Sequence, residues 1–305
     1  MFERYKFHLL LHLIIFMWGF TGILGKLIQL DAVVIVWHRV LIAMMALGLA
    51  LLILKKPIRL NSLKQTLKLA GVGTIVALHW VTFYQSIQLS TASLGILCLS
   101  TTTLHVAWLE PIVMKRPFSL VEFGLGLLVI CGIYFVSRDF DASDLKALMY
   151  GLSSALFAAL FSVFNGKLVQ ETPAHQITLV EMIAAFLIIS LFLMMNGRLN
   201  GSLFEMTTSD FLWLLFLGVL CTSFAFLATI EVVKRLGAFT VSLSINLEPV
   251  YTIVLAIFIL NEHELLNASF YIGSVVIVLV IILNGLIRHY LKPSPENNVN
   301  QQIEH

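Results

Sequence analysis

The feature that most constrains this fold is a series of long apolar segments running along almost the whole chain. Each segment approaches the roughly 20 mostly apolar residues that a helix needs to cross a lipid bilayer. The limits of the ten segments are 7–28, 33–54, 66–88, 92–114, 120–137, 147–169, 176–195, 210–233, 239–260 and 267–288. The sequence therefore predicts an all-α membrane protein with ten transmembrane helices.

Composition excludes several other classes of protein. The 305 residues are 59% hydrophobic and 12% charged, whereas soluble domains carry about 25% charged residues. So few charges cannot cover a soluble globule, which excludes a soluble enzyme, a disordered chain and a nucleic-acid-binding protein. The apolar run that begins at Phe7 continues past Trp18 without a persuasive cleavage site, so we interpret it as a retained first span.

The positions of Lys and Arg predict the orientation in the membrane, because cytoplasmic loops carry an excess of these residues. With the N-terminus placed in the cytoplasm, 14 of the 19 basic residues lie at inner ends of the spans. Three lie in outer loops and two within outer ends of spans. We therefore expect both termini in the cytoplasm, and a bacterial inner membrane fits this pattern. The inner residues are Arg4, Lys6, Lys55, Lys56, Arg59, Lys64, Lys68, Lys115, Arg116, Lys167, Lys234, Arg235, Arg288 and Lys292.

The chain contains signs of an internal repeat. The tripeptide Gly-Lys-Leu occurs at 25–27 and 166–168, and the surroundings of Gly126 resemble those of Gly273. Because each copy would hold five spans, the second copy must be inverted relative to the first, as in many secondary transporters. The expected units are 1–137, the first repeat; 138–146, an outer connecting loop; 147–290, the second, inverted repeat; and 291–305, a polar cytoplasmic tail. The tripeptide Leu-Glu-Pro at 109–111 and 247–249 has a different spacing and is interpreted as coincidence.

The order of several polar residues resembles a known family. Trp18 and Gly19 are followed by Lys26 in span 1, Arg39 lies early in span 2, and Leu-Glu-Pro at 247–249 precedes Glu262. This arrangement resembles the EamA-like branch of the drug/metabolite transporter superfamily over residues 7–290. The resemblance implies transport of small metabolites, often the export of amino acids, through a central cavity built mainly by spans 1, 3, 4, 6, 8 and 9. Thr102 stands where the family commonly has a proline, which puts a symmetric kink in span 4 in question.

Depth in the bilayer selects candidate binding residues, because polar side chains are costly in lipid unless they face a cavity or a partner. Six spans place polar or Trp side chains near their midpoints, which predicts the walls of a small-molecule site. The candidates for substrate binding are Trp18, His79, Trp80, Tyr84, Thr102, Thr103, Ser162, Ser223, Asn246 and Glu248. The aromatic residues could equally be packing residues, and the threonines could bond to carbonyls of their own helix.

Two of these residues are also candidates for proton coupling. Glu248 lies halfway along an apolar span, next to Pro249, which removes the helical partner of the Ile245 carbonyl. Desolvation favours the neutral carboxyl, which suits proton exchange; the alternative is a protonated or paired Glu that joins helices. His79 could relay protons near neutral pH or be a neutral histidine bonded between helices. Structural or gating roles are expected for Lys26, Arg39, Glu181 and Pro249.

These observations predict a secondary active transporter that works by alternating access and exports amino acids or related small metabolites. No GxxxxGK[ST] motif is present to bind ATP, and no metal or cofactor is expected. Expected partners are the lipid bilayer, a small-molecule substrate and, as a candidate, protons, with the chain as a monomer or a homodimer. Export of nucleosides, sugars or cations is an alternative, and an intramembrane enzyme or a channel is a lesser one.

Overall fold

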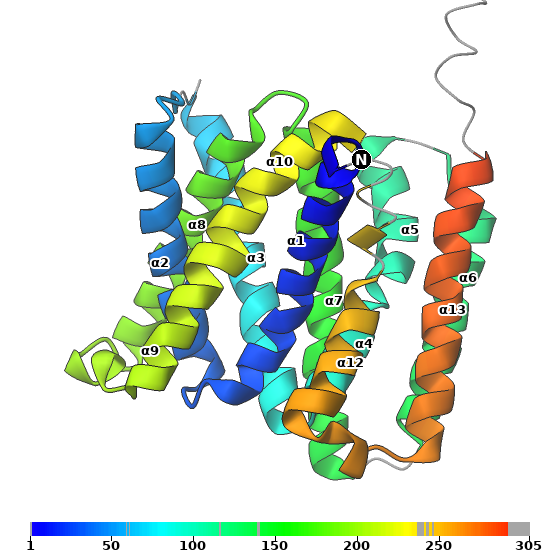
Figure 1. Cartoon of the computed structure of the whole chain (residues 1–305). Helices are drawn as coiled ribbons and strands as arrows, with labels where there is room; N and C mark the ends of the chain where they lie inside the picture. Colours follow the sequence, from blue (N-terminus) through cyan, green and yellow to red (C-terminus); the bar gives the residue numbers. More distant parts are fainter. Residues whose placement is uncertain are drawn as a thin grey trace, which may run out of the picture.

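The computed structural model describes residues 2–58, 60, 62–115, 117–138, 141–236, 241, 244–245 and 247–291. The described chain forms a bundle of helices whose long axes run roughly side by side (Figure 1). The elements are α1 Phe2–Leu27, α2 Ala32–Ile53, α3 Leu63–Leu89, α4 Ala92–Leu99, α5 Thr102–Met114, α6 Leu120–Val136, α7 Ala142–Leu168, α8 Ala174–Met195, η1 Gly201–Phe204, α9 Thr208–Leu215, η2 Phe216–Phe224, α10 Ala225–Leu236, α12 Glu248–Leu260, η3 Glu262–Glu264 and α13 Ala268–Leu291.

Short polar residues between the apolar segments begin the helices. Asp31 accepts hydrogen bonds from the backbone N–H groups of Val33 and Val34 at the start of α2. Ser62, Thr91, Ser119 and Asp141 cap α3, α4, α6 and α7 in the same way. These side chains satisfy N–H groups that have no partner within the helix. Each span therefore starts close to where the polar breaks in the sequence predict.

Within the described residues, seven helical segments are long and apolar enough to cross a membrane. The seven are 5–27, 32–53, 63–89, 92–114, 142–168, 174–195 and 208–229. Three shorter apolar helices cover Leu120–Val136, Glu248–Leu260 and Ala268–Val280. Together these segments coincide with the apolar segments of the sequence, and the chain is an all-helical integral membrane protein.

Two of the expected spans are not continuous α-helices. In the fourth, α4 ends at Leu99 and α5 begins at Thr102, so the helix is interrupted although no proline stands there. In the eighth, nine residues from Phe216 to Phe224 form a π-helix between α9 and α10. The interruption in the fourth span occurs although Thr102 replaces the proline common in the family that the sequence resembles, and both interruptions occur where hydroxyl-bearing residues gather. The helix α12 begins at Glu248, with Pro249 in its first turn, where a missing N–H costs nothing.

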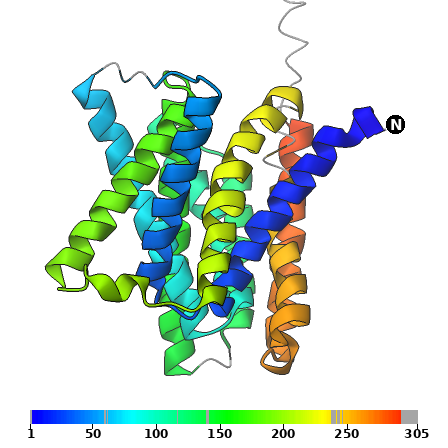
Figure 2. The same cartoon turned by 60° about the vertical axis from the view of Figure 1, so that its left-hand side comes forward.

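The helices are arranged with α6 and α13 paired along one side of the bundle and α2 and α8 on the other (Figure 1). Figure 2 shows the same bundle from the side of α2, with α1 crossing in front of the orange α12. The N-terminus and the connection after α2 lie at one end, called here the N-terminal end, and α9 begins at the opposite end. The α6–α13 pair is tight because a Cβ added at Gly273 would lie 2.5 Å from the carbonyl oxygen of Gly132.

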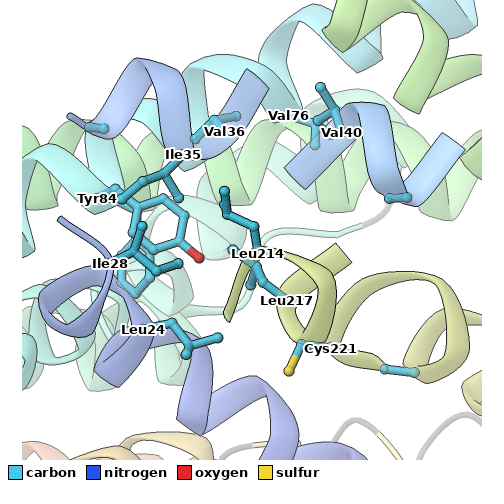
Figure 3. Packing of buried hydrophobic residues seen from close by; sticks show 14 of the residues in the cluster. Leu24, Ile28, Ile35, Val36, Val40, Val76, Tyr84, Leu214, Leu217 and Cys221 are labelled. Carbon is cyan, nitrogen blue, oxygen red and sulfur yellow. The ribbon is translucent and has the colours of Figure 1, made fainter. Parts of the chain in front are cut away.

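The largest buried cluster joins α1, α2, α3, α8 and the η2 region. Figure 3 shows the ring of Tyr84 beside Ile28 and Ile35, with Leu214 and Leu217 on the side of its hydroxyl oxygen. Tyr84 is completely buried, and a Cβ at Gly25 would lie 2.9 Å from its ring. This packing brings α1 and α3 close together and directs the Tyr84 hydroxyl into the interior of the bundle.

Candidate functional site

A buried arginine forms the centre of the candidate site. Arg39 of α2 is only 5% exposed. Its Nε donates to Oγ1 of Thr222 at 3.1 Å and its Nη1 donates to the hydroxyl of Tyr84 at 3.2 Å. Its Cζ lies 3.9 Å from the centroid of the Trp80 ring, a cation–π contact. These four residues, from α2, α3 and η2, are called here the Arg39 cluster.

The π-helix η2 forms the wall of the site that faces Arg39. Thr222 and Ser223 donate their hydroxyls to the carbonyls of Leu217 and Gly218, five residues earlier. Ser223 also donates to the carbonyl of Ala43 on α2, at 3.0 Å. A Cβ at Gly218 would lie 2.6 Å from Ile42, so η2 and α2 are in close contact. Insertions of this kind occur frequently at functional sites in helices.

The carboxyl of Glu248 lies within the electrostatic influence of Arg39 without touching it. Glu248 is half-buried at the first position of α12, and the charge of Arg39 acts on it. Its carbonyl accepts a hydrogen bond from Thr252. Its carboxylate forms neither a hydrogen bond nor an ion pair with another described residue. An acidic and a basic group thus share the interior, each without a direct partner of opposite charge in the described chain.

His79 joins two helices. Its Nδ1 lies 3.0 Å from the carbonyl oxygen of Ser154 and 2.9 Å from the Ser154 hydroxyl oxygen, on α7. The Ser154 hydroxyl in turn donates to the carbonyl of His79. The ring stacks on Phe83 and packs against Phe161. This is the arrangement of a histidine bonded between helices, the second of the two interpretations of the sequence.

The threonines of the interrupted span bond mainly to backbone carbonyls. Thr102 donates to the carbonyl of Ala155 on α7 at 3.3 Å, and Thr103 donates to the carbonyl of Ser100 at 2.9 Å. Thr101 donates to Cys98. The first of these bonds holds the start of α5 against α7, and the other two join hydroxyls to carbonyls that also accept backbone N–H groups.

Other sequence candidates lie outside the Arg39 cluster. Ser162 is exposed and lines a cavity of about 160 Å³ with Glu110 and Gly166, whereas Ser154 on the same helix faces the interior. Trp18 of α1 is partly buried and packs against the main core. Asn246 lies outside the described residues.

The expected structural residues have distinct surroundings. Glu262 is 2% exposed and accepts from the backbone N–H groups of Ala92 and Ser93, at 2.6 and 3.0 Å, in the first turn of α4. Lys26 of α1 is half-buried, and the charge of this carboxylate acts on its ammonium group. Pro249 is buried in the first turn of α12. The sequence analysis named Glu262 only as part of the family pattern and assigned it no contact, because the N–H groups that it accepts from lie about 170 residues earlier in the chain.

Glu181 and Arg39 occupy the same position in two helices of equal length. Arg39 is the eighth residue of α2 and Glu181 the eighth of α8, and both helices have 22 residues. Glu181 lies apart from the Arg39 cluster, beside Asn165 of α7. The two residues therefore act at separate places.

No group of three or more His, Cys, Asp or Glu side chains within the described residues could hold a metal ion. The three cysteines, Cys98, Cys131 and Cys221, are free. A second cavity, of about 300 Å³, lies at the end opposite the N-terminus, where Ser90 donates to Asp144.

An all-helical bundle with apolar outer faces, interrupted spans and buried polar groups defines a polytopic integral membrane protein of the transporter class. The profile of the EamA-like transporter family matches residues 6–138 and again 145–286. The chain belongs to this family, the EamA-like branch of the drug/metabolite transporter superfamily, and is a membrane transporter of small molecules.

Other comparisons bear on the fold. In all, 22 chains of solved structures match. One of them, titled only as the crystal structure of a protein, is 13% identical in sequence, with a TM-score of 0.66 over 95% of this chain and 99% of the other. At this identity the likeness shows the fold alone. The search of curated proteins found no match.

Proposed function

We propose that the chain is a secondary active transporter that exports amino acids or related small metabolites by alternating access. The observation that carries this proposal is a pair of opposite charges in the interior, neither of which forms an ion pair with a described residue. Arg39 forms no ion pair within the described chain, and the carboxylate of Glu248 has no hydrogen-bonding partner there. A zwitterion offers a carboxylate to the guanidinium and an ammonium to the carboxylate. Trp80, Tyr84 and Thr222 orient the guanidinium for this contact.

The second match of the family profile, at residues 145–286 after 6–138, supports two related halves, and we propose that they are inverted five-helix repeats that work by alternating access. The described residues other than glycine with positive φ are Lys55, Lys115 and Asn261, and Gly197 shares this conformation. Lys55 and Gly197 follow the equal helices α2 and α8, and Lys115 and Asn261 end α5 and α12. Matching helix ends of this kind are expected when one unit occurs twice.

Two shorter helices, α5 and α12, also match between the halves. The helix α5 begins at Thr102 and α12 at Glu248, and each ends 12 residues later, at Met114 and Leu260. The units of the proposal are residues 1–137 and 147–290, with 138–146 as the outer connection and 291–305 as the tail. Discontinuous helices near the midplane are where such transporters bind their substrates. Both termini would lie in the cytoplasm, and the two halves would rock about the Arg39 cluster.

Counterflow in proteoliposomes tests the proposal. Vesicles containing purified protein are preloaded with an unlabelled amino acid, and uptake of the same labelled amino acid is followed. Saturable uptake that is lost in the double variant Arg39→Met, Glu248→Gln supports the proposal. If the vesicles take up labelled nucleosides, sugars or organic cations but no amino acid, the proposed substrate class is wrong. The family assignment does not change.

A further inference from the structure

A second buried acid lies in the N-terminal half of the bundle, away from the Arg39 cluster. Glu181 of α8 is 2% exposed, and its carboxyl meets the side-chain amide of Asn165 on α7. Oε1 of Glu181 and Oδ1 of Asn165 are both buried, and neither has a hydrogen-bonding partner among the described residues. Two neighbouring side chains thus each carry a buried acceptor oxygen that receives no hydrogen bond.

Close packing seals this place from water. A Cβ at Gly73 of α3 would lie 2.6 Å from the carbonyl oxygen and 2.8 Å from the Cα of Glu181. Because position 73 is a glycine, α3 can press directly on the backbone of α8. An apolar cluster lies about one helical turn nearer the N-terminal end and separates the acid from that end of the bundle. Its members are Leu69, Ile177, Val180 and Leu168.

The described helices around Glu181 bring no cation to it. The nearest basic groups on α3, Lys64 and Lys68, are exposed. Lys167 of α7 donates to the carbonyl of Val113, and His175 of α8 lies against the carbonyl of Pro57. The segment of α2 after Arg39 carries no titratable side chain. The carboxyl of Glu181 is influenced by burial and by Asn165, and by no charged residue.

A buried carboxylate without a cation is costly, and such groups become neutral instead. A neutral carboxylic acid carries an O–H donor that a carboxylate lacks. A proton on Oε1 supplies the missing hydrogen atom, and Oδ1 of the neighbouring Asn165 is the buried acceptor that lacks a donor. We propose that Glu181 and Asn165 form a proton-binding site, occupied in this conformation. The proton comes from water, one O–H bond forms on Glu181, and no other bond changes.

This site goes beyond the transport proposal, since it exists whether or not the chain moves amino acids. It also gives Gly73 a role, because any side chain there would separate α3 from α8 and admit water to the acid. The opposite arrangement is an ionised Glu181 whose carboxylate accepts a hydrogen bond from the Asn165 amide, whose oxygen and nitrogen are assigned rather than observed. The two arrangements differ in the protonation of one carboxyl group.

Infrared difference spectroscopy on the full-length protein in lipid vesicles distinguishes them without any substrate. The spectrum of Glu181→Gln is subtracted from that of the wild type at neutral pH. The proposal predicts one carboxylic-acid C=O band that is present in the wild type and lost in the variant. In Asn165→Ala this band should shift to higher frequency, because the acid loses its acceptor. The control Glu171→Gln, at an exposed position nearby, should change only carboxylate bands.

Two results would overturn the proposal. A difference spectrum with carboxylate bands alone would mean that Glu181 is ionised and held by the Asn165 amide. A carboxylic-acid band that is present in choline chloride and absent in sodium chloride would mean that the site binds sodium in place of a proton. If Glu181→Gln does not fold, the shift of the band in Asn165→Ala serves as the test in its place, and an unshifted spectrum then contradicts the proposal.

Discussion

The guanidinium of Arg39 lies against the face of Trp80, with 3.9 Å between Cζ and the ring centroid. The arginine comes from α2 and the tryptophan from α3, so the contact also holds two helices together. With Tyr84 and Thr222 it stabilises a charge that is almost completely removed from solvent. A buried charge that is retained without an ion-pair partner in the described chain is a functional candidate by default.

Arg39→Met should reduce amino acid counterflow by about tenfold or more, since a hydrogen bond to a charged group contributes about 1.5–3 kcal/mol. Its thermal stability should fall little or rise, because removing a buried charge offsets the lost contacts. Arg39→Lys should also transport poorly, since an ammonium cannot form the planar contacts of a guanidinium. Initial rates and melting curves check both variants. Counterflow at the wild-type rate in Arg39→Met would remove Arg39 from the site.

Glu248→Gln should slow exchange of substrate and abolish accumulation driven by a pH gradient. The amide keeps the shape of the protonated carboxyl, but it offers the substrate ammonium no negative charge and cannot release a proton. Uptake is compared with and without the gradient, and Glu205→Gln, at an exposed position, serves as the control. If Glu248→Gln still accumulates substrate in response to the gradient, the coupling proton is carried elsewhere.

Gly273→Ala should destabilise the protein by about 1–3 kcal/mol, the usual cost of forcing extra atoms into a packed interface. The new Cβ would lie 2.5 Å from the Gly132 carbonyl oxygen, so α6 and α13 would have to separate. Gly124→Ala on α6 is the matched control, because its Cβ would meet nothing within 4 Å. The melting temperatures of both variants in detergent test this prediction. Equal stability of the two would argue against the α6–α13 contact.

Glu262→Ala should also destabilise the fold, by about 1–3 kcal/mol, because two buried N–H groups of α4 would lose their acceptor. These are the groups of Ala92 and Ser93. Glu264→Ala, two residues later and exposed, should leave the melting temperature unchanged. Equal melting temperatures for Glu262→Ala and the wild type would show that α4 is capped adequately by Thr91 alone.

The spans could be predicted from the sequence because their signal is local. The apolar segments place most helix ends within a few residues of those observed. The two Leu-Glu-Pro tripeptides lie at different positions in their helices. Pro111 lies deep within α5, whereas Pro249 lies in the first turn of α12.

Whether a side chain points to the lipid or to the interior of the bundle could not be predicted in the same way. Lipid is as apolar as the packed interior of the bundle, so these helices lack the polar face that marks orientation in soluble proteins. Depth alone selected Ser162, which is exposed on α7, and did not select Ser154, which bonds to His79. The interruption before Thr102 and the π-helix at Phe216–Phe224 depend on contacts with other helices, and hydropathy does not report them.

The account rests on the interior charges being a substrate site, and transport itself tests this most directly. Purified protein in proteoliposomes is preloaded with mixed labelled amino acids, and release is followed with and without a pH gradient. Saturable release of some amino acids, lost when Arg39 and Glu248 are replaced by Met and Gln together, is the predicted result. Release by the double variant at the wild-type rate, or no release of any amino acid from folded protein, would contradict the proposed site or its substrate class.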